Sequence, residues 1–204
     1  MKLRIWTDSG KSRKSLIFID DKVWGALPSR AFRMLYPDNF DQEIESAENL
    51  IALLKEQALA QLLDYLTKFE HSEWQSRQFL IRRKYHQSIL VECVSYCLKM
   101  NYINDARFAE LLIRSLIERG TSKQAIVSKL YEQHIKPAFW EPILNELYDR
   151  EDASDKLFEL LNKYCNTHGG IPLSKLREKV FTYLYRKGYE LDLISWAWEK
   201  YTLG

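Results

Sequence analysis

Two cysteines in the middle of the chain are the residues best placed for metal chemistry. Cys93 and Cys97 stand four positions apart and would share one helix face, with His86 close by in the sequence. A catalytic zinc site needs three protein ligands and a water, so a metal-assisted hydrolase is one hypothesis. Buried cysteines that only pack are commoner, and this spacing favours that role.

Other signatures of catalysis are missing from the sequence. It has no glycine-rich phosphate-binding motif and no H-E-x-x-H motif. His71, His134 and His168 have no nucleophile or carboxylate at a telling spacing. The adjacent Asp20 and Asp21 are typical of a turn between strands. We therefore expect a protein that is not an enzyme and that has no catalytic residue, metal or cofactor.

Basic side chains give a stronger indication, because several lie in or near a recurring segment. The candidates for contact with a phosphate backbone or an acidic protein groove are Arg82, Arg83, Lys84, Arg114, Arg119, Lys129, Arg186 and Lys187. A solvated helix face is the alternative interpretation of the same residues.

The segments that would position these residues recur three times. Each has a leucine, four mostly polar residues and a closing aromatic or isoleucine: LIRRKY from residue 80, LYEQHI from 130 and LYRKGY from 184. Apolar residues follow each closing residue at +4 and +8, namely Ile89 and Cys93, Phe139 and Ile143, and Leu193 and Ala197. The copies are 50 and 54 residues apart, and a helical period near 50 is typical of a repeat array.

Each copy is predicted to hold three helices. In the second copy, Asp105 is predicted to cap the first helix and Gly120 to end it. Pro137 suits the first turn of the third helix, whereas Pro142 should bend that helix. The third copy carries a longer loop, NTHGGIPLS.

Capping boxes are predicted at the start of the second helix in two copies. Ser72 with Gln75 gives this pattern in the first copy, and Thr121 with Gln124 gives it in the second. Both pairs mark the residue at which the helix should begin.

The first 27 residues predict strands, with a turn over residues 8–14. One or two helical turns are expected before Pro37. Residues 1–36 carry eight basic and three acidic side chains, and residues 37–66 carry one basic and seven acidic. The two ends of this segment are therefore expected to meet different surroundings.

The expected fold is mainly α, with tandem three-helix repeats in an elongated, curved array, preceded by a small N-terminal β-hairpin or short β-sheet. The predicted division is a β segment with an acidic linker at 1–50, and three-helix repeats at 51–104, 105–151 and 152–204.

Composition is consistent with this fold. The 204 residues are 46% hydrophobic and include only 7 glycines and 5 prolines, which favours helices over a many-stranded sheet. No apolar run suits a membrane span, the N-terminus does not resemble a cleaved signal, and three cysteines suggest a reducing cytoplasm. We expect a cytoplasmic monomer that does not bind membranes.

Tryptophans offer two interpretations. Trp74, Trp140 and Trp196 lie in predicted helices, where they could pack in the cores of the repeats or serve as platforms for stacking bases. Core packing is favoured.

Residues 102–135 resemble the central signature of the RecX family of bacterial recombination regulators. The matching residues are Tyr102, Ile103, Asn104, Asp105, Phe108, Ala109, Arg114, Gly120, Lys129, Leu130 and Ile135. The flanking copies resemble the family's other repeats, so the resemblance covers residues 55–204 well and 1–54 loosely. Two departures are that only Gly188 keeps the glycine the family usually has before the closing aromatic, and that the NTHGGIPLS loop is unusual.

The resemblance implies a protein without enzymatic activity that binds the RecA recombinase and its filament on single-stranded DNA. It would negatively modulate filament growth, ATP hydrolysis and strand exchange in DNA repair and recombination and in the SOS response. The alternative is a helical-repeat DNA-binding module that acts independently of RecA. Because the net charge is only +2, tight autonomous DNA binding is not expected, although weak direct binding is.

Overall fold

The computed structural model describes residues 1–7, 14–33, 36 and 40–203. The chain divides into two compact units, Met1–Asn104 and Asp105–Gly204, and each is described by itself. Most of the turn predicted over residues 8–14, and the helix stop predicted at Pro37, lie outside the described residues. The finer division predicted from the sequence stays a prediction.

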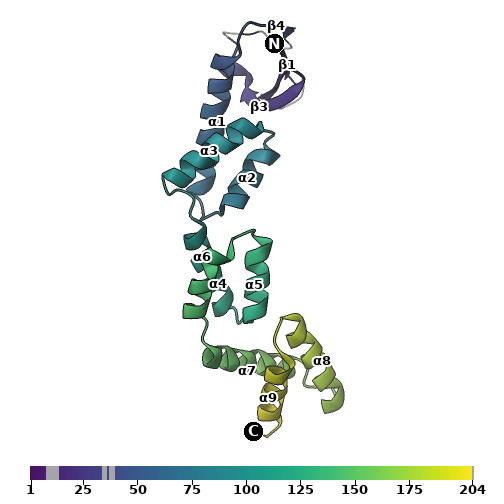
Figure 1. Ribbon diagram of the computed structural model, residues 1–204. Coiled ribbons are helices and arrows are strands. Elements are labelled where there is room, and N and C mark those ends of the chain that lie inside the picture. Colours follow the sequence, from purple (N-terminus) through teal and green to yellow (C-terminus); the bar gives the residue numbers. More distant parts are fainter. Residues whose placement is uncertain (8–13, 34–35, 37–39, 204) are drawn as a thin grey trace. The chain divides into compact units, whose positions relative to one another are not determined.

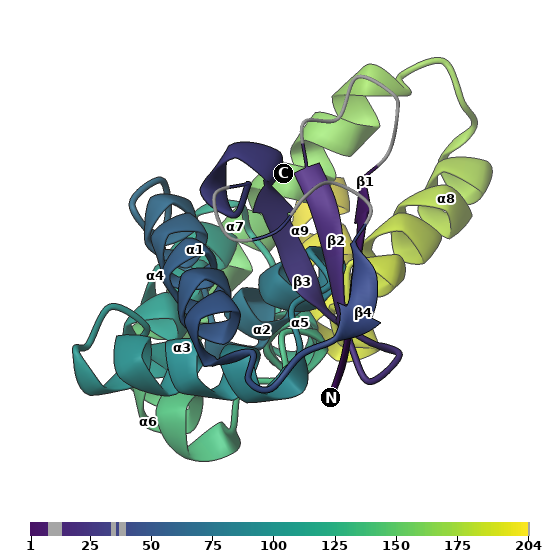
Figure 2. The same ribbon diagram turned by 90° about the horizontal axis from the view of Figure 1, so that it is seen from above.

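The first unit begins with a four-stranded antiparallel sheet in the order β3-β2-β1-β4 (Figure 2). The strands are β1 (Lys2–Thr7), β2 (Lys14–Ile19), β3 (Lys22–Pro28) and β4 (Asp41–Glu43). A short 3₁₀ turn, η1 (Ser29–Ala31), follows β3. The predicted short sheet is confirmed, and its extra strand β4 was not predicted.

Strand β4 forms because β1 offers it an edge. Its sequence, Asp-Gln-Glu, has no apolar alternation and suggested only an acidic linker. In the structure Arg4 lies opposite Asp41, and the amide of Ile5 donates to the carbonyl of Phe40 at 2.7 Å. Pairing with a neighbouring strand therefore decides this element.

The turn between β2 and β3 confirms the interpretation of the paired aspartates. Asp20 and Asp21 both have positive φ, at 48° and 59°, as a two-residue hairpin turn with matching twist requires. The Asp20 carboxylate also accepts a hydrogen bond from the amide of Lys2 at 2.8 Å. These two acids shape the sheet.

Nine α-helices follow in the described part of the chain (Figure 1). They are α1 (Glu48–Leu66), α2 (Glu73–Arg82), α3 (Gln87–Lys99), α4 (Asp105–Glu118), α5 (Lys123–Glu132), α6 (Pro137–Leu147), α7 (Arg150–Thr167), α8 (Leu173–Arg186) and α9 (Leu191–Leu203). We call α1–α3 the first triplet, α4–α6 the second and α7–α9 the third. The prediction of a mainly helical protein is confirmed.

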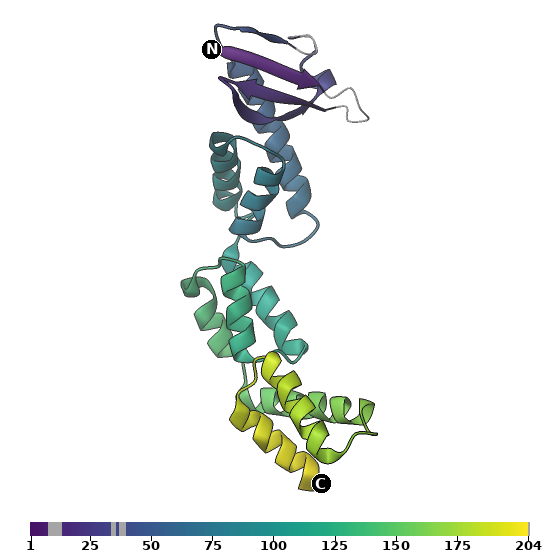
Figure 3. The same ribbon diagram turned by 90° about the vertical axis from the view of Figure 1, so that its right-hand side faces the viewer.

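The sheet and the first triplet share one hydrophobic core. Leu3 and Ile5 of β1 and Leu50 and Leu54 of α1 are each no more than 1% exposed, and all belong to the same cluster. Figure 3 shows α1 lying against the sheet. Gly25 of β3 lies so close to α1 that a Cβ there would be 2.8 Å from the Leu54 side chain. The strands are therefore part of this unit's core.

The second unit has two hydrophobic clusters. The second triplet packs around residues such as Ile113, Leu130 and Trp140, and the third around residues such as Leu161 and Leu184. Each cluster is made by the three helices of its own triplet, as expected for repeats that each bury an apolar face.

Most of the predicted helix ends are confirmed. Ser72 and Gln75 form a reciprocal capping box at the start of α2. Gly120 ends α4 with φ of +65°, and the amide of Thr121 donates to the carbonyl of Leu116 at 3.0 Å. Pro137 occupies the first turn of α6 and Pro142 lies inside that helix.

Two caps differ from their predictions by one residue. Asp105 is the first residue of α4. Its negative charge lies in the first turn, where it interacts favourably with the positive end of the helix dipole. The box predicted at Thr121 and Gln124 is wrong, because Ser122 caps α5 and accepts from the amide of Ala125. The Ser122 side chain is buried, and its hydroxyl also donates to the carbonyl of Lys187 in the third triplet at 3.1 Å.

In the second triplet the apolar residue that faces the core lies one position beyond the recurring +4 position. Phe139, at +4 from the closing residue, is 42% exposed, whereas Trp140 beside it is 4% exposed. The positions that are buried in all three triplets are +5 and +9, namely Leu90 and Val94, Trp140 and Leu144, and Ile194 and Trp198. The local spacing could not show which of two adjacent apolar residues faces the core.

The prediction that three tryptophans pack in the cores of the repeats is confirmed for only some of them. Trp140 is buried and Trp74 is half-buried, but Trp196 is 42% exposed, so its placement in the core is wrong. None of the helices in the described residues combines the length and apolar character needed to cross a bilayer.

Candidate functional site

The three recurring segments fold into the same turn. At the ends of α2, α5 and α8, the amide of the closing residue donates to the carbonyl of the leucine five positions earlier, at 3.2 Å in each case. The pairs are Tyr85 and Leu80, Ile135 and Leu130, and Tyr189 and Leu184. The side chains of these pairs are buried, which is the apolar contact that accompanies this helix-ending motif. We call these three structures the repeat turns.

The residue before the closing one is left-handed in every repeat turn. Lys84, His134 and Gly188 have φ of 63°, 55° and 82°. A non-glycine residue costs about 1 kcal/mol there, which two of the turns tolerate. Gly188 has a further reason to be glycine, because a Cβ would be 2.7 Å from the Oγ of Ser122.

Aromatic rings form a column beside the first repeat turn. The ring of Tyr65 stacks between His71, at a centroid distance of 3.7 Å, and Phe79, at 4.1 Å. The guanidinium of Arg83 lies 3.6 Å from the Phe79 ring centroid and covers the ring's face. The order of groups is therefore histidine, tyrosine, aromatic and cation.

The third repeat turn carries a column in the same order. Tyr164 stacks on His168 at 4.2 Å and on Tyr183 at 4.6 Å between ring centroids. The ammonium of Lys187 lies 5.4 Å from the Tyr183 ring centroid. Arg83 and Lys187 each stand three positions after the leucine of their turn, so the same place in the repeat presents a cation held on a ring.

Two of the three predicted cations of the second triplet are paired with acids of their own helices. Arg114 contacts the carboxylate of Glu110 at 2.8 Å, and Lys129 contacts that of Glu132 at 2.6 Å. These pairs are solvent-exposed and contribute little stability, but they offset the positive charge locally. Arg119 is exposed at the end of α4.

The remaining candidates lie at the ends of α2 and α8. Arg82 and Lys84 are exposed beside Arg83, and Arg186 is exposed beside Lys187. Of the eight predicted residues, three lie together in the first unit at the end of α2, and the other five lie at separate places in the second unit.

A shallow hollow of about 650 Å³ adjoins the column of the third triplet. Its lining includes Lys179, Arg186 and Lys187, with Glu178 as its acidic residue. Three cations against one carboxylate make this hollow suitable for an anionic group. Lys179 was not among the predicted residues, because it lies before the recurring segment that begins at Leu184. It stands four residues before Tyr183, one turn away on α8.

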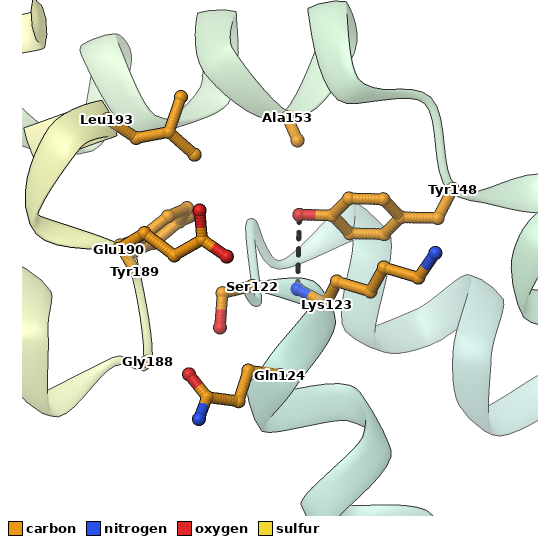
Figure 4. Close-up of a pocket in the computed structure, with 9 residues that line it drawn as sticks. All are labelled: Ser122, Lys123, Gln124, Tyr148, Ala153, Gly188, Tyr189, Glu190 and Leu193. Carbon is orange, nitrogen blue, oxygen red and sulfur yellow. Dashed lines mark hydrogen bonds between the residues drawn. The ribbon is translucent and has the colours of Figure 1, made fainter.

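A second pocket, of about 320 Å³, lies where the third repeat turn meets α5 (Figure 4). The hydroxyl of Ser122 donates to the carbonyl of Lys187 at 3.1 Å, and the Tyr189 hydroxyl donates to the carbonyl of Gly120. Burial raises the pKa of Tyr189 to about 12. These bonds hold the second and third triplets together within the unit.

The side chains of this pocket are mostly committed to structure. The hydroxyl of Tyr148 accepts from the amide of Lys123 at 3.1 Å, and the Lys123 ammonium donates to Asn145. Burial raises the pKa of Tyr148. Figure 4 shows the Glu190 carboxylate directed toward the Tyr148 ring.

The cysteines lie in a packing environment. Burial raises the pKa values of Cys93 and Cys97 to about 11, so both remain thiols at neutral pH. His86 caps α3 and stacks on Trp24 at 4.1 Å between ring centroids. No group of three or more potential metal ligands lies together among the residues that the structure describes.

Comparisons with known proteins agree with the repeat structure. A family model for the third three-helix domain of RecX matches residues 151–198. Regulatory protein RecX of Staphylococcus aureus strain Newman is 30% identical over 138 residues, which cover 67% of this chain and 50% of that protein. The chain belongs to the RecX family.

Other RecX proteins extend the comparison. The RecX of Staphylococcus haemolyticus is 28% identical over 136 residues, covering 66% of this chain and 50% of that protein. The chain spans about half the length of the curated relatives it matches.

Two solved RecX structures show the shared fold. The crystal structure of RecX from Lactobacillus salivarius has a TM-score of 0.63 at 20% identity, covering 74% of this chain and 97% of that one. A second, described as regulatory protein RecX, has a TM-score of 0.64 at 16% identity and covers 96% of this chain and 98% of that one. At these identities the likeness concerns the fold alone.

Proposed function

We propose that this protein regulates the RecA recombinase by binding RecA and its filament on single-stranded DNA. It lowers filament growth, ATP hydrolysis and strand exchange, works in the bacterial cytoplasm as a monomer, and has no enzymatic activity of its own. Membership of the RecX family is the observation that carries this proposal.

The contacts with the filament are proposed at the first and third repeat turns. Arg83 and Lys187 are fixed against aromatic rings, so less side-chain entropy is lost when they bind a carboxylate or phosphate. Arg82, Lys84 and Arg186 add charge beside them. Arg114 and Lys129 are weaker candidates, because each already contacts a glutamate of its own helix.

The proposal is tested by adding substoichiometric protein to RecA on single-stranded DNA and measuring ATP hydrolysis and strand exchange. We expect both rates to fall. Wild-type protein that changes neither rate would refute the proposed function. Binding to bare DNA that falls steeply with salt, without any effect on RecA, would favour the independent DNA-binding module.

The contact assignment has its own variants. R82E/R83E/K84E and R186E/K187E are each expected to need about tenfold more protein for the same inhibition, because the charges that meet the filament are reversed. K163E/K175E is the matched control for the second variant, since it makes the same change in charge at exposed lysines of the third triplet. Both reversal variants acting like wild type would refute these contacts.

A further inference from the structure

One further feature recurs in all three repeat turns. The residue after the leucine is apolar or aromatic and faces solvent: Ile81 is 48% exposed, Tyr131 is 55% exposed and Tyr185 is 62% exposed. We call Ile81, Tyr131 and Tyr185 the exposed triad. Exposed apolar residues are ordinary when single, but recurrence at one position of a repeat is not explained by chance exposure.

The three side chains occupy equivalent places in the backbone. In each turn the carbonyl of the triad residue accepts a hydrogen bond from the amide of the left-handed residue three positions later, at 2.8 to 2.9 Å. The helix direction, the turn and the position are therefore the same in all three copies. The Cα–Cβ bond of each triad residue therefore leaves its helix in the same direction relative to its own turn.

The turn itself does not need an apolar residue at this position. Its apolar contact is made by the leucine and the closing residue, and its strain by the left-handed residue. Ile81 and Tyr185 are neither part of this apolar contact nor the left-handed residue of their turns. Tyr131 makes an edge contact with the Trp140 ring at 5.6 Å between centroids, yet more than half of it stays in solvent.

We propose that the exposed triad binds three equivalent apolar sockets on successive identical protein subunits. This inference rests on the proposed function, in which the partner is a polymer of one protein. A side chain that recurs at one place in a repeat fits a partner surface that also recurs. Cations directly follow the triad residue in the first and third turns, so the sockets proposed there have acidic rims.

The side-chain types favour a protein partner over nucleic acid. Two tyrosines could stack on bases, but Ile81 has no π-face and cannot. Burial of apolar surface is the only chemistry that all three side chains share. The common occupant is therefore an apolar socket.

The experiment measures binding of the full chain to preformed RecA filaments on single-stranded DNA, with bare DNA in parallel. I81S, Y131S and Y185S are each expected to weaken filament binding about fivefold or more, and the triple variant about a hundredfold. V91S/L111S/L191S is the matched control, with one exposed apolar residue from each triplet, 40%, 50% and 55% exposed. It should bind within twofold of wild type.

The Y131L/Y185L variant distinguishes a protein partner from nucleic-acid bases. It also keeps large apolar side chains at both positions, so a loss of binding is not caused by a smaller residue. Leucine keeps apolar volume but cannot stack, so near wild-type filament binding supports sockets. Loss of filament binding by this variant together with loss of bare-DNA binding would overturn them in favour of base stacking.

The remaining outcomes separate this inference from the proposed function. Wild type that binds filaments while the I81S/Y131S/Y185S variant binds equally well overturns the triad alone. One single substitution that accounts for the whole triple effect also overturns it, because the sockets would not recur. Wild type that fails to bind filaments refutes the proposed function, and the triad with it.

Discussion

The second repeat turn differs from the first and third in its side chains but not in its backbone. All three use the same hydrogen bonds and the same left-handed position. The first and third close with a buried tyrosine and carry an aromatic column capped by a cation. The second closes with Ile135, and Lys129 stands where the others have the ring of Phe79 or Tyr183.

This difference separates what the fold needs from what the surface does. The buried leucine and a large closing residue suffice for the turn, since tyrosine and isoleucine both serve there. The column is an addition of two triplets, so it is the better guide to function. Substitutions at the closing residues and at the left-handed residues should therefore change the free energy of unfolding by different amounts in the three triplets. Substitutions in the columns should affect function in the first and third triplets.

The largest expected difference appears at alkaline pH. Burial raises the pKa values of Tyr85 and Tyr189 to about 12, from 10 in the unfolded chain. The folded state therefore holds these protons more tightly. The contribution of each raised pKa to the free energy of unfolding, about 2–3 kcal/mol for each tyrosine, is fully present below pH 10. It is lost as the pH rises toward 12.

Urea unfolding of Y85F and Y189F at pH 8 and pH 11.5 checks this prediction. Each variant should lose about 2 kcal/mol less than wild type between the two pH values. At pH 8 each also loses about 1 kcal/mol, because Y85F removes the hydrogen bond from Gln61 and Y189F removes the hydrogen bond to Gly120. I135V is the control from the second turn, and it should show the full alkaline loss. Equal losses in all four proteins would contradict the tyrosine assignment.

The second prediction concerns the left-handed residues. G188A should lower the free energy of unfolding by about 2 kcal/mol, from left-handed strain and the approach of its Cβ to Ser122. K84A should change it by less than about 0.5 kcal/mol, because a side chain is already present there. The measurement is urea unfolding at pH 7.

A double-mutant cycle with S122A identifies the cause of the loss. Removing the Ser122 hydroxyl relieves the close approach, so S122A/G188A should be more stable than the sum of the single changes by about 1 kcal/mol. Strictly additive effects would show that backbone strain alone is responsible.

Much of this fold could be predicted from the sequence, because the repeat is encoded locally. The recurring leucine spacing predicted a mainly helical repeat protein, and Ser72 with Gln75 predicted the start of a helix; the structure confirms the helical content and this capping box. Strand β4 could not be predicted, because its pairing partner is about 40 residues away in β1. Phe139 is exposed and Trp140 is buried because of the way α6 packs against the other helices of its triplet. The local spacing of apolar residues does not determine this packing.

The candidate site was less predictable for the same reason. The run Arg82, Arg83 and Lys84 was visible as charge, but the ring under Arg83 is stacked on Tyr65, from another helix. The pairing of Arg114 with Glu110 follows the ordinary spacing of four residues and could have been anticipated. Columns formed between helices have no such local pattern.

The smallest expected effect is at Lys84, where stability and function should move in opposite directions. K84G relieves about 1 kcal/mol of left-handed strain but adds unfolded-chain entropy, so the net gain in unfolding free energy is about 0.5 kcal/mol. If Lys84 contacts the filament, the same variant inhibits RecA less. Urea unfolding and the ATPase assay are measured together, with K84R as the control that keeps both strain and charge. A K84G protein that is less stable than wild type would show that the lysine side chain stabilises the turn, and its loss of inhibition would then have a structural cause.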